Sequence, residues 1–219
     1  MTKESDIKIK NFFNLAFQNH QQKNYKKAVD FYNKILTINP VHFESIFLLG
    51  TLSFQLNNFE KAKNYYERAI NIKPNDASAY YNLAVVLAEI GDLERSIEYY
   101  KKAISIRNNH ANSYNNLGQV ILKLGQNKNA IVYFEKAIQL DPKHANAYNN
   151  LGLVHLELND LIKAKNYYEK ALQLDPNNEK FNSNYGNLLL YLNQHQKGLE
   201  YIKRSCGYIS FSQENFNII

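Results

Sequence analysis

A 34-residue period in the positions of proline constrains this chain more than any other feature of its sequence. The four prolines are Pro40, Pro74, Pro142 and Pro176, and Asn108 occupies the one vacant place in the series. A unit of this length can hold two short helices, but it is too short to bury a core alone. Stacked units bury a continuous core, so the period predicts a solenoid, which offers a partner a long surface rather than a closed pocket.

Residues of one type also recur at other fixed positions of the 34-residue repeat, and each set of equivalent positions is called a column. When proline is the thirty-second residue, the repeats begin at Ile9, Phe43, Ala77, Ala111, Ala145 and Glu179. The eighth residue of every repeat is Gly or Ala, and the twentieth is Ala in four of the six. The twenty-fourth is aromatic in the first five: Tyr32, Tyr66, Tyr100, Phe134 and Tyr168. A small residue lets a neighbouring helix approach closely, and the ring beside it fills the remaining space.

These columns resemble the tetratricopeptide repeat family over residues 9–212. The resemblance implies an all-α fold, in which antiparallel helix pairs stack into a right-handed superhelical solenoid whose first helices line the concave side. It implies five regular repeats and one degenerate terminal repeat, where Gly198, Ile202 and Ser210 replace the alanine, the aromatic residue and the proline. We expect residues 1–8 to be a lead-in. Residues 207–219 would be an apolar tail that overlaps the end of the last repeat.

Composition narrows the location of the protein. No run of 18 apolar residues is present, so we expect no transmembrane helix. The polar start of the chain lacks the apolar region of a secretory signal. The single cysteine, Cys206, excludes an internal disulfide and fits a reducing compartment. The sequence therefore predicts a cytoplasmic protein without membrane attachment.

The net charge of +6 is organised in the sequence. The twenty-sixth residue of each repeat is basic: Lys34, Arg68, Lys102, Lys136, Lys170 and Arg204. This column lies near the C-terminal end of each second helix, where cations interact favourably with the helix dipole. Glu67, Glu135 and Glu169 precede three of its members directly. We interpret the column as a solvated outer face, and because the first helices lack a basic groove we do not expect a nucleic-acid partner.

The sequence lacks the usual signatures of catalysis. It contains no glycine-rich phosphate loop, no His-Glu-x-x-His motif and no paired cysteines. His42, His110 and His144 each precede a first helix, where other repeats have Asp76 and Asn178, so a helix-capping role is indicated. The alternative is a two-histidine zinc site formed by His110 and His144. We predict no enzymatic activity, no metal and no cofactor.

An asparagine column points to a binding surface. The sixth residue of each repeat is Asn14, Leu48, Asn82, Asn116, Asn150 and Asn184. It is turned about a third of a helical turn from the buried leucine at the seventh position. An amide side chain has both a donor and an acceptor, which match a peptide bond. A ladder of such amides could therefore hold an extended peptide backbone.

The fifth residues extend this candidate surface: Phe13, Phe47, Tyr81, Asn115, Asn149 and Ser183. The three aromatic members could form an apolar floor at the N-terminal end. None is the lysine with which chaperone-binding members of the family hold a C-terminal carboxylate, so no carboxylate clamp is expected. The asparagine ladder resembles the repeat superhelix of the O-linked N-acetylglucosamine transferases, whose catalytic domain this chain lacks.

Three interpretations of these columns remain open. The first is a non-catalytic protein-interaction scaffold that binds an extended peptide or protein segment. The second is a substrate-recruiting arm of an enzyme such as a glycosyltransferase, whose catalytic part is absent from this chain. In the third, the asparagines are inherited repeat consensus and bind nothing. The apolar tail could cap the sixth repeat, lead to a further domain or mediate self-association.

Overall fold

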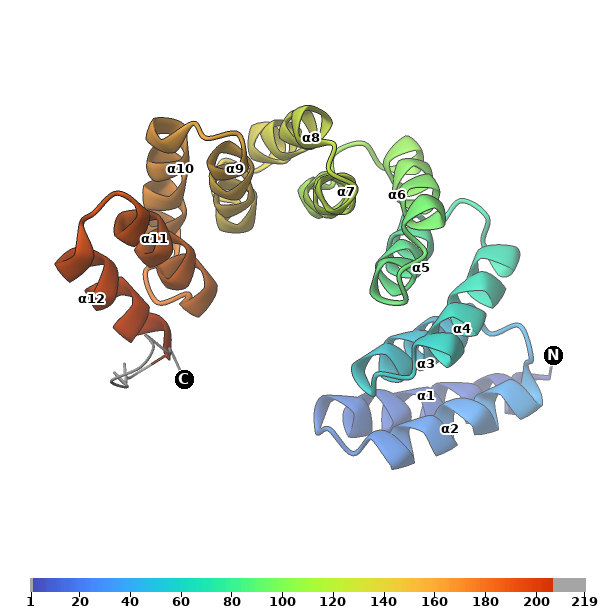
Figure 1. Cartoon of the computed structure of the whole chain (residues 1–219). Coiled ribbons are helices and arrows are strands. Elements are labelled where there is room, and N and C mark those ends of the chain that lie inside the picture. Colours follow the sequence, from blue (N-terminus) through green and yellow to red (C-terminus); the bar gives the residue numbers. More distant parts are fainter. Residues whose placement is uncertain (1, 207–219) are drawn as a thin grey trace. The chain divides into compact units, whose positions relative to one another are not determined.

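The computed structural model describes residues 2–206, and these residues form twelve α-helices (Figure 1). Their bounds are α1 Lys3–Gln21, α2 Tyr25–Ile38, α3 Phe43–Gln55, α4 Phe59–Ile72, α5 Ala77–Glu89, α6 Leu93–Ile106, α7 Ala111–Lys123, α8 Asn127–Leu140, α9 Ala145–Glu157, α10 Leu161–Leu174, α11 Glu179–Tyr191 and α12 His195–Cys206. Odd-numbered helices are the first helices of the repeats and even-numbered helices the second. The apolar tail discussed above lies outside the described residues.

Each first helix from α3 onward begins at the first residue of a 34-residue repeat. The residue before it caps the helix through its side chain in α3, α5, α9 and α11. The predicted capping role of His110 is wrong, because its side chain accepts no hydrogen bond from the backbone of α7. The carboxylate of Asp76 accepts a hydrogen bond of 2.8 Å from the N–H of Ala79. His42 does the same through Nδ1, at 3.3 Å from the N–H of Ser45. An oxygen or nitrogen acceptor at this position satisfies a helix N–H that has no intrahelical partner.

The first helix begins earlier than the repeat period suggests. It begins at Lys3, so most of the expected lead-in over residues 1–8 is helical. The hydroxyl of Thr2 caps it by accepting from the N–H of Ser5, and Glu4 and Asp6 place negative charge in its first turn. Although α1 has 19 residues, no helix within residues 2–206 is both long and apolar enough to cross a membrane.

The alternation of small and large residues follows from close helix approach. A Cβ added to Gly118 would lie 2.7 Å from the ring of Phe134, and one added to Gly152 would lie 2.6 Å from the ring of Tyr168. These distances are too short for carbon atoms, so a Cβ at either position would require the neighbouring ring to shift. In the sixth repeat, a Cβ on Gly198 would lie 2.9 Å from the carbonyl oxygen of Gly186. This degenerate repeat still forms a helix pair.

The turn inside each repeat needs a left-handed residue. Gly91 and Gly125 adopt φ angles of 86° and 72° there. The same conformation occurs in the other repeats at Lys23, Asn57, Asn159 and Asn193, with φ between 56° and 60°. Asparagine tolerates this conformation better than most residues, which explains why it replaces glycine in three repeats.

The chain divides into two compact units, residues 1–108 and residues 109–219. The division follows Asn108, the residue that replaces proline in the repeat series. In the first unit, α2 packs on α3, α4 packs on α5, and the first helices α3 and α5 touch. In the second unit, α8 packs on α9, α10 packs on α11, and α9 touches both α7 and α11. Each unit is therefore a stack of helix pairs.

The leucine column shows what stacking contributes to burial. Leu49, Leu83 and Leu151 are at most 1% exposed. Leu15, the corresponding residue of α1, is 41% exposed. One end of the first unit therefore presents apolar surface that interior repeats bury.

Candidate peptide-binding surface

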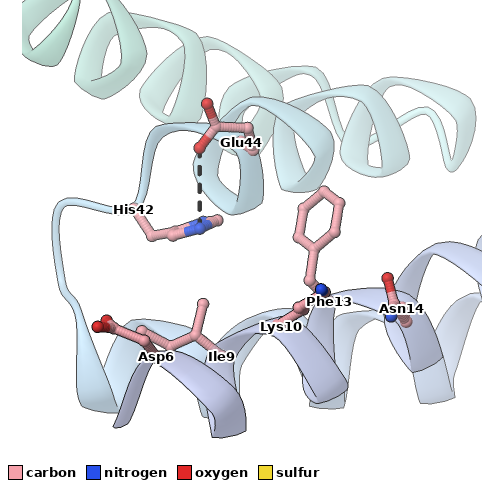
Figure 2. Close-up of a pocket in the computed structure, with 7 residues that line it drawn as sticks. All are labelled: Asp6, Ile9, Lys10, Phe13, Asn14, His42 and Glu44. Carbon is pink, nitrogen blue, oxygen red and sulfur yellow. Dashed lines mark ion pairs between the residues drawn. The ribbon is translucent and has the colours of Figure 1, made fainter. Parts of the chain in front are cut away.

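A hollow of about 360 Å³ lies in the first unit, between α1 and the beginning of α3 (Figure 2). Its lining residues are Asp6, Ile9, Lys10, Phe13, Asn14, His42 and Glu44. Phe13 and Asn14 are the fifth and sixth residues of the first repeat, which the sequence proposes as partner-binding positions. Both candidate residues therefore line a hollow that is large enough for a side chain of a ligand.

Aromatic contacts hold the floor of this hollow in place. Ile9 and Phe13 rise from α1 toward α3 (Figure 2). The ring of Phe13 lies 5.9 Å from that of Tyr32 in an edge-to-face arrangement and 5.8 Å from that of His42. It also stacks on Phe17 at 6.4 Å, and Phe17 is 43% exposed. Rings that pack in this way form a rigid apolar surface at little entropic cost to a ligand.

The rim of the hollow is charged. Glu44 accepts a hydrogen bond of 2.9 Å from Nζ of Lys73, and its other carboxylate oxygen lies 3.8 Å from Nε2 of His42. Partial burial alone would raise the pKa of Glu44, but the Lys73 hydrogen bond and charge hold it below its ordinary value. Glu44 is therefore ionised at neutral pH. The side chains of Lys10 and Asn14 are exposed beside it.

In the first unit, the fifth residue of each repeat packs an aromatic ring on the twenty-fourth. Phe47 meets Tyr66 edge-to-face at 5.6 Å, and Tyr81 meets Tyr100 at 5.9 Å. The Phe13 ring packs edge-to-face on Tyr32 in the same way. All three fifth residues are half-buried, so they contribute to the core and to the surface together.

In the second unit, amide pairs occupy the corresponding positions. Nδ2 of Asn150 donates to Oδ1 of Asn115 at 2.9 Å, and Nδ2 of Asn184 donates to Oδ1 of Asn149 at the same distance. Each bond joins the sixth residue of one repeat to the fifth residue of the preceding repeat. Asn115, Asn149 and Asn150 are only 4%, 1% and 2% exposed. The two amide pairs therefore link neighbouring first helices, α7 with α9 and α9 with α11.

The remaining members of the column are more accessible. Asn14 is exposed, and Asn82, Asn116 and Asn184 are half-buried. Oδ1 of Asn116 accepts a hydrogen bond of 3.1 Å from Nδ2 of Asn115. Leu48, the one apolar member of the column, packs against the same hydrophobic cluster as Phe13. Even the asparagines of this column therefore differ in their surroundings.

The histidines that precede first helices are engaged in local hydrogen bonds. His144 accepts from the N–H of Ala147 through Nδ1 at 3.2 Å, while its Nε2 lies 2.9 Å from Oδ1 of Asn112. Because Nδ1 accepts, Nε2 carries the proton and donates to Asn112. Nδ1 of His110 lies 2.7 Å from the hydroxyl of Ser113. Both nitrogens of His144 are therefore committed, which leaves the two-histidine zinc alternative without support.

Two features of the site were not evident in the repeat columns. The hollow also uses Ile9, Lys10, His42 and Glu44, which belong to the beginnings of two successive first helices. The sequence predicts His42 only as a helix cap. The amide pairs do not follow from either column alone, because each pair joins the fifth residue of one repeat to the sixth residue of the next. An asparagine followed 35 residues later by another is the signal that identifies them.

Four models of the tetratricopeptide repeat match this chain, over residues 9–42, 47–113, 109–177 and 167–200. The chain belongs to the tetratricopeptide repeat family. Its repeat period, its helix pairs and its small-to-large packing all agree with this assignment. Proteins of this family are generally non-catalytic interaction scaffolds, and protein or peptide partners are implied for this chain as well. No curated protein is detectably similar to it.

Three solved structures illustrate the same architecture. PilW, described as a widely conserved type IV pilus biogenesis factor, is 20% identical to this chain and has a TM-score of 0.81. The match covers 98% of this chain and 97% of the PilW chain. PilF of Pseudomonas aeruginosa is 27% identical, covers 78% of both chains and has a TM-score of 0.70. YrrB, described as a TPR protein with an unusual peptide-binding site, is 22% identical to this chain and has a TM-score of 0.60. The match covers 80% of this chain and 91% of the YrrB chain.

Proposed function

We propose that this tetratricopeptide repeat protein holds an extended peptide segment on its first helices, with one side chain of the peptide seated in the hollow between α1 and α3. The hollow is the observation that carries the proposal. It combines the apolar floor of Phe13 and Ile9 with the exposed amide of Asn14. Pockets that recognise peptides commonly pair an apolar surface with a few polar groups that fix orientation.

The accessible asparagines support contacts to the peptide backbone. Asn14 and Asn82 in the first unit, and Asn184 in the second, each retain exposed side-chain surface on a first helix. An amide can donate to a peptide carbonyl and accept from a peptide N–H at once. The buried Asn115, Asn149 and Asn150 would support such a surface from behind rather than touch the peptide. YrrB is a precedent for a peptide-binding site on this fold.

The hollow can be tested with peptides selected on the full-length chain from a displayed random library. We expect selected peptides to share one bulky apolar residue. The Phe13→Ala variant should weaken their binding by roughly tenfold, as expected for truncation of an interface aromatic. A photoreactive residue at Asn14 should crosslink to them, whereas one at Asn33, exposed on α2 of the same repeat, should not.

Two outcomes would contradict the assignment. Selected peptides that bind Phe13→Ala as tightly as the parent, with the helical signal unchanged, would exclude the hollow. Crosslinking from Asn33 rather than Asn14 would place peptide binding on the second helices. Phe13→Leu is the matched control, because it keeps an apolar side chain of similar size against Tyr32 and should retain most of the affinity.

A further inference from the structure

The second helices carry the positive charge of this chain. Within residues 2–206, α2, α4, α6, α8, α10 and α12 contain 17 basic and 8 acidic residues, a formal charge of +9. The six first helices contain 5 basic and 6 acidic residues, a formal charge of −1. The excess is present in both units: the three second helices carry +4 in the first and +5 in the second. A face with one sign of charge attracts a partner of the opposite sign.

The basic column at the twenty-sixth position forms no ion pair within the described part of the chain. Lys34, Arg68 and Arg204 instead lie over the aromatic ring three residues before them, with distances to the ring centroid of 4.9, 5.8 and 4.7 Å. Lys136 and Lys170 donate to neutral glutamines. The cations are held in place, but their charge is not neutralised by a carboxylate.

The neighbouring glutamates have other partners. Glu67 lies 3.5 Å from the guanidinium of Arg95 in the next repeat. Glu169 accepts a hydrogen bond of 2.6 Å from the hydroxyl of Tyr185 and lies 3.9 Å from Nζ of Lys165. The compensation that the sequence suggested for Arg68 and Lys170 is therefore not provided by direct pairing.

A hollow recurs beside this column in each unit. In the first unit, a hollow of about 490 Å³ is lined by Tyr80, Glu98, Tyr99, Lys101, Lys102 and Ser105. In the second, one of about 530 Å³ is lined by the residues 34 positions later: Tyr114, Val132, Tyr133, Glu135, Lys136 and Gln139. The recurrence makes the hollow a property of the repeat. Each hollow has aromatic rings and a column lysine.

The ring contacts distinguish between possible anionic partners. Single-stranded nucleic acid gains affinity by stacking bases on free aromatic faces. In the hollow of the first unit, Tyr99 stacks on Tyr80 at 6.0 Å and lies under the guanidinium of Arg95. Ring faces that already have partners are poor platforms for bases. Carboxylates need only the cations at the rim.

An anionic membrane fits this face less well. Stable attachment to a membrane surface needs an apolar anchor in addition to basic residues. Among the described second helices, the exposed large hydrophobic residues are Val132 and Ile162, both in the second unit. The basic column, in contrast, is present in both units.

We propose that the second helices bind an acidic protein segment, whose aspartate or glutamate side chains pair with the basic column while its apolar side chains rest in the recurring hollows. This surface is separate from the peptide-binding surface proposed on the first helices. Each contact is individually weak because all the column cations except the half-buried Lys136 are exposed. Affinity therefore comes from several repeats together and falls as salt is added.

The test measures binding of fluorescent poly-L-glutamate to the full-length chain at low and physiological salt. One variant carries Lys136→Gln, Lys170→Gln and Arg204→Gln in the second helices. Its matched control carries Lys123→Gln, Lys143→Gln and Lys180→Gln, which has the same net charge but changes exposed lysines outside the second helices. We expect the column variant to lose roughly tenfold in affinity and the control less than about twofold.

Four results would overturn the proposal: no binding of poly-L-glutamate at low salt, equal loss in both variants, tighter binding of oligouridylate than of poly-L-glutamate, or tighter binding of phosphatidylserine vesicles than of poly-L-glutamate. A copolymer of glutamate and tyrosine should bind more tightly than poly-L-glutamate, because only the copolymer can also fill the hollows. Circular dichroism of both variants checks that the helices remain intact.

Discussion

The two units use the same repeat position in chemically different ways. In the first unit, the fifth residue is Phe13, Phe47 or Tyr81, and its ring packs edge-to-face on an aromatic residue of the same repeat. In the second unit, the fourth and fifth repeats have Asn115 and Asn149 at this position, and the side-chain carbonyl of each accepts from an asparagine of the next repeat. The aromatic contacts join helices within a repeat, whereas the amide contacts join one repeat to the next.

This difference shows that a shared column does not imply a shared role. An edge-to-face contact tolerates small shifts, because aromatic attraction varies gradually with distance. A buried amide pair is directional, and losing one partner leaves the other without a hydrogen bond. We therefore infer that repeat-to-repeat register is more tightly specified between α7, α9 and α11 than between the first helices of the first unit.

The largest expected effect comes from removing one member of an amide pair. Asn150→Ala leaves Oδ1 of Asn115, a buried acceptor, without its partner, and should lower the free energy of unfolding by about 2 kcal/mol. Asn82→Ala is the matched control at the same repeat position in the first unit. Its side chain is half-buried and makes no hydrogen bond within the described residues, so it should cost less than about 0.5 kcal/mol. Urea unfolding followed by circular dichroism measures both.

A double variant sharpens this test. Replacing Asn115 and Asn150 together by leucine removes both polar partners at similar volume, so stability should recover most of what Asn150→Ala loses. The first unit already has an apolar pair at this spacing, Phe13 and Leu48, which pack against one hydrophobic cluster. Equal losses for Asn150→Ala and Asn82→Ala would show that the amide pair does not distinguish the units.

Acid should weaken the second unit through His144. Burial holds the pKa of His144 below its ordinary value, against the opposing charge of Asp141. The folded state therefore binds this proton less readily than the unfolded state, so the stabilisation is complete above about pH 6.5 and is lost as pH falls below it. Protonation places a hydrogen on Nδ1, which can then no longer accept from Ala147, and the lost cap is worth about 1 kcal/mol.

Urea unfolding at several pH values checks this expectation. The His144→Asp variant keeps a capping acceptor, as Asp76 does in the third repeat, and should show a smaller loss of stability between about pH 7 and pH 5. A residual loss of the same sign is expected from His155, whose pKa burial also lowers. An unchanged pH profile in His144→Asp would exclude the cap as the titrating element.

Much of the fold could be predicted because a repeat contacts mainly its neighbours. The 34-residue period predicted an all-α stack of helix pairs, and glycine–ring contacts such as Gly152 with Tyr168 account for the small-and-large columns. The hollow was harder to foresee, because its lining combines residues of α1 with residues at the beginning of α3 rather than the members of one repeat column. Likewise, the amphipathic position of Asn150 did not reveal its burial, which arises from the preceding repeat. Partner-binding roles for the asparagines remain predictions.

The smallest expected effect is a gain in stability from a substitution outside the fifth and sixth positions of the repeat. Asn108 replaces the repeat proline, yet Arg107 before it has φ −135° and ψ 96°, close to the −133° and 92° of Asn39 before Pro40. This extended conformation is the one that a residue before proline prefers. The N–H of Asn108 donates no hydrogen bond within the described residues, so proline removes no bond there.

Asn108→Pro should therefore raise the free energy of unfolding by about 0.4–1 kcal/mol, because the unfolded chain loses conformational freedom. Asn108→Ala lacks the ring and should change little. A loss of stability in Asn108→Pro alone would show that this repeat end requires a backbone that proline cannot adopt.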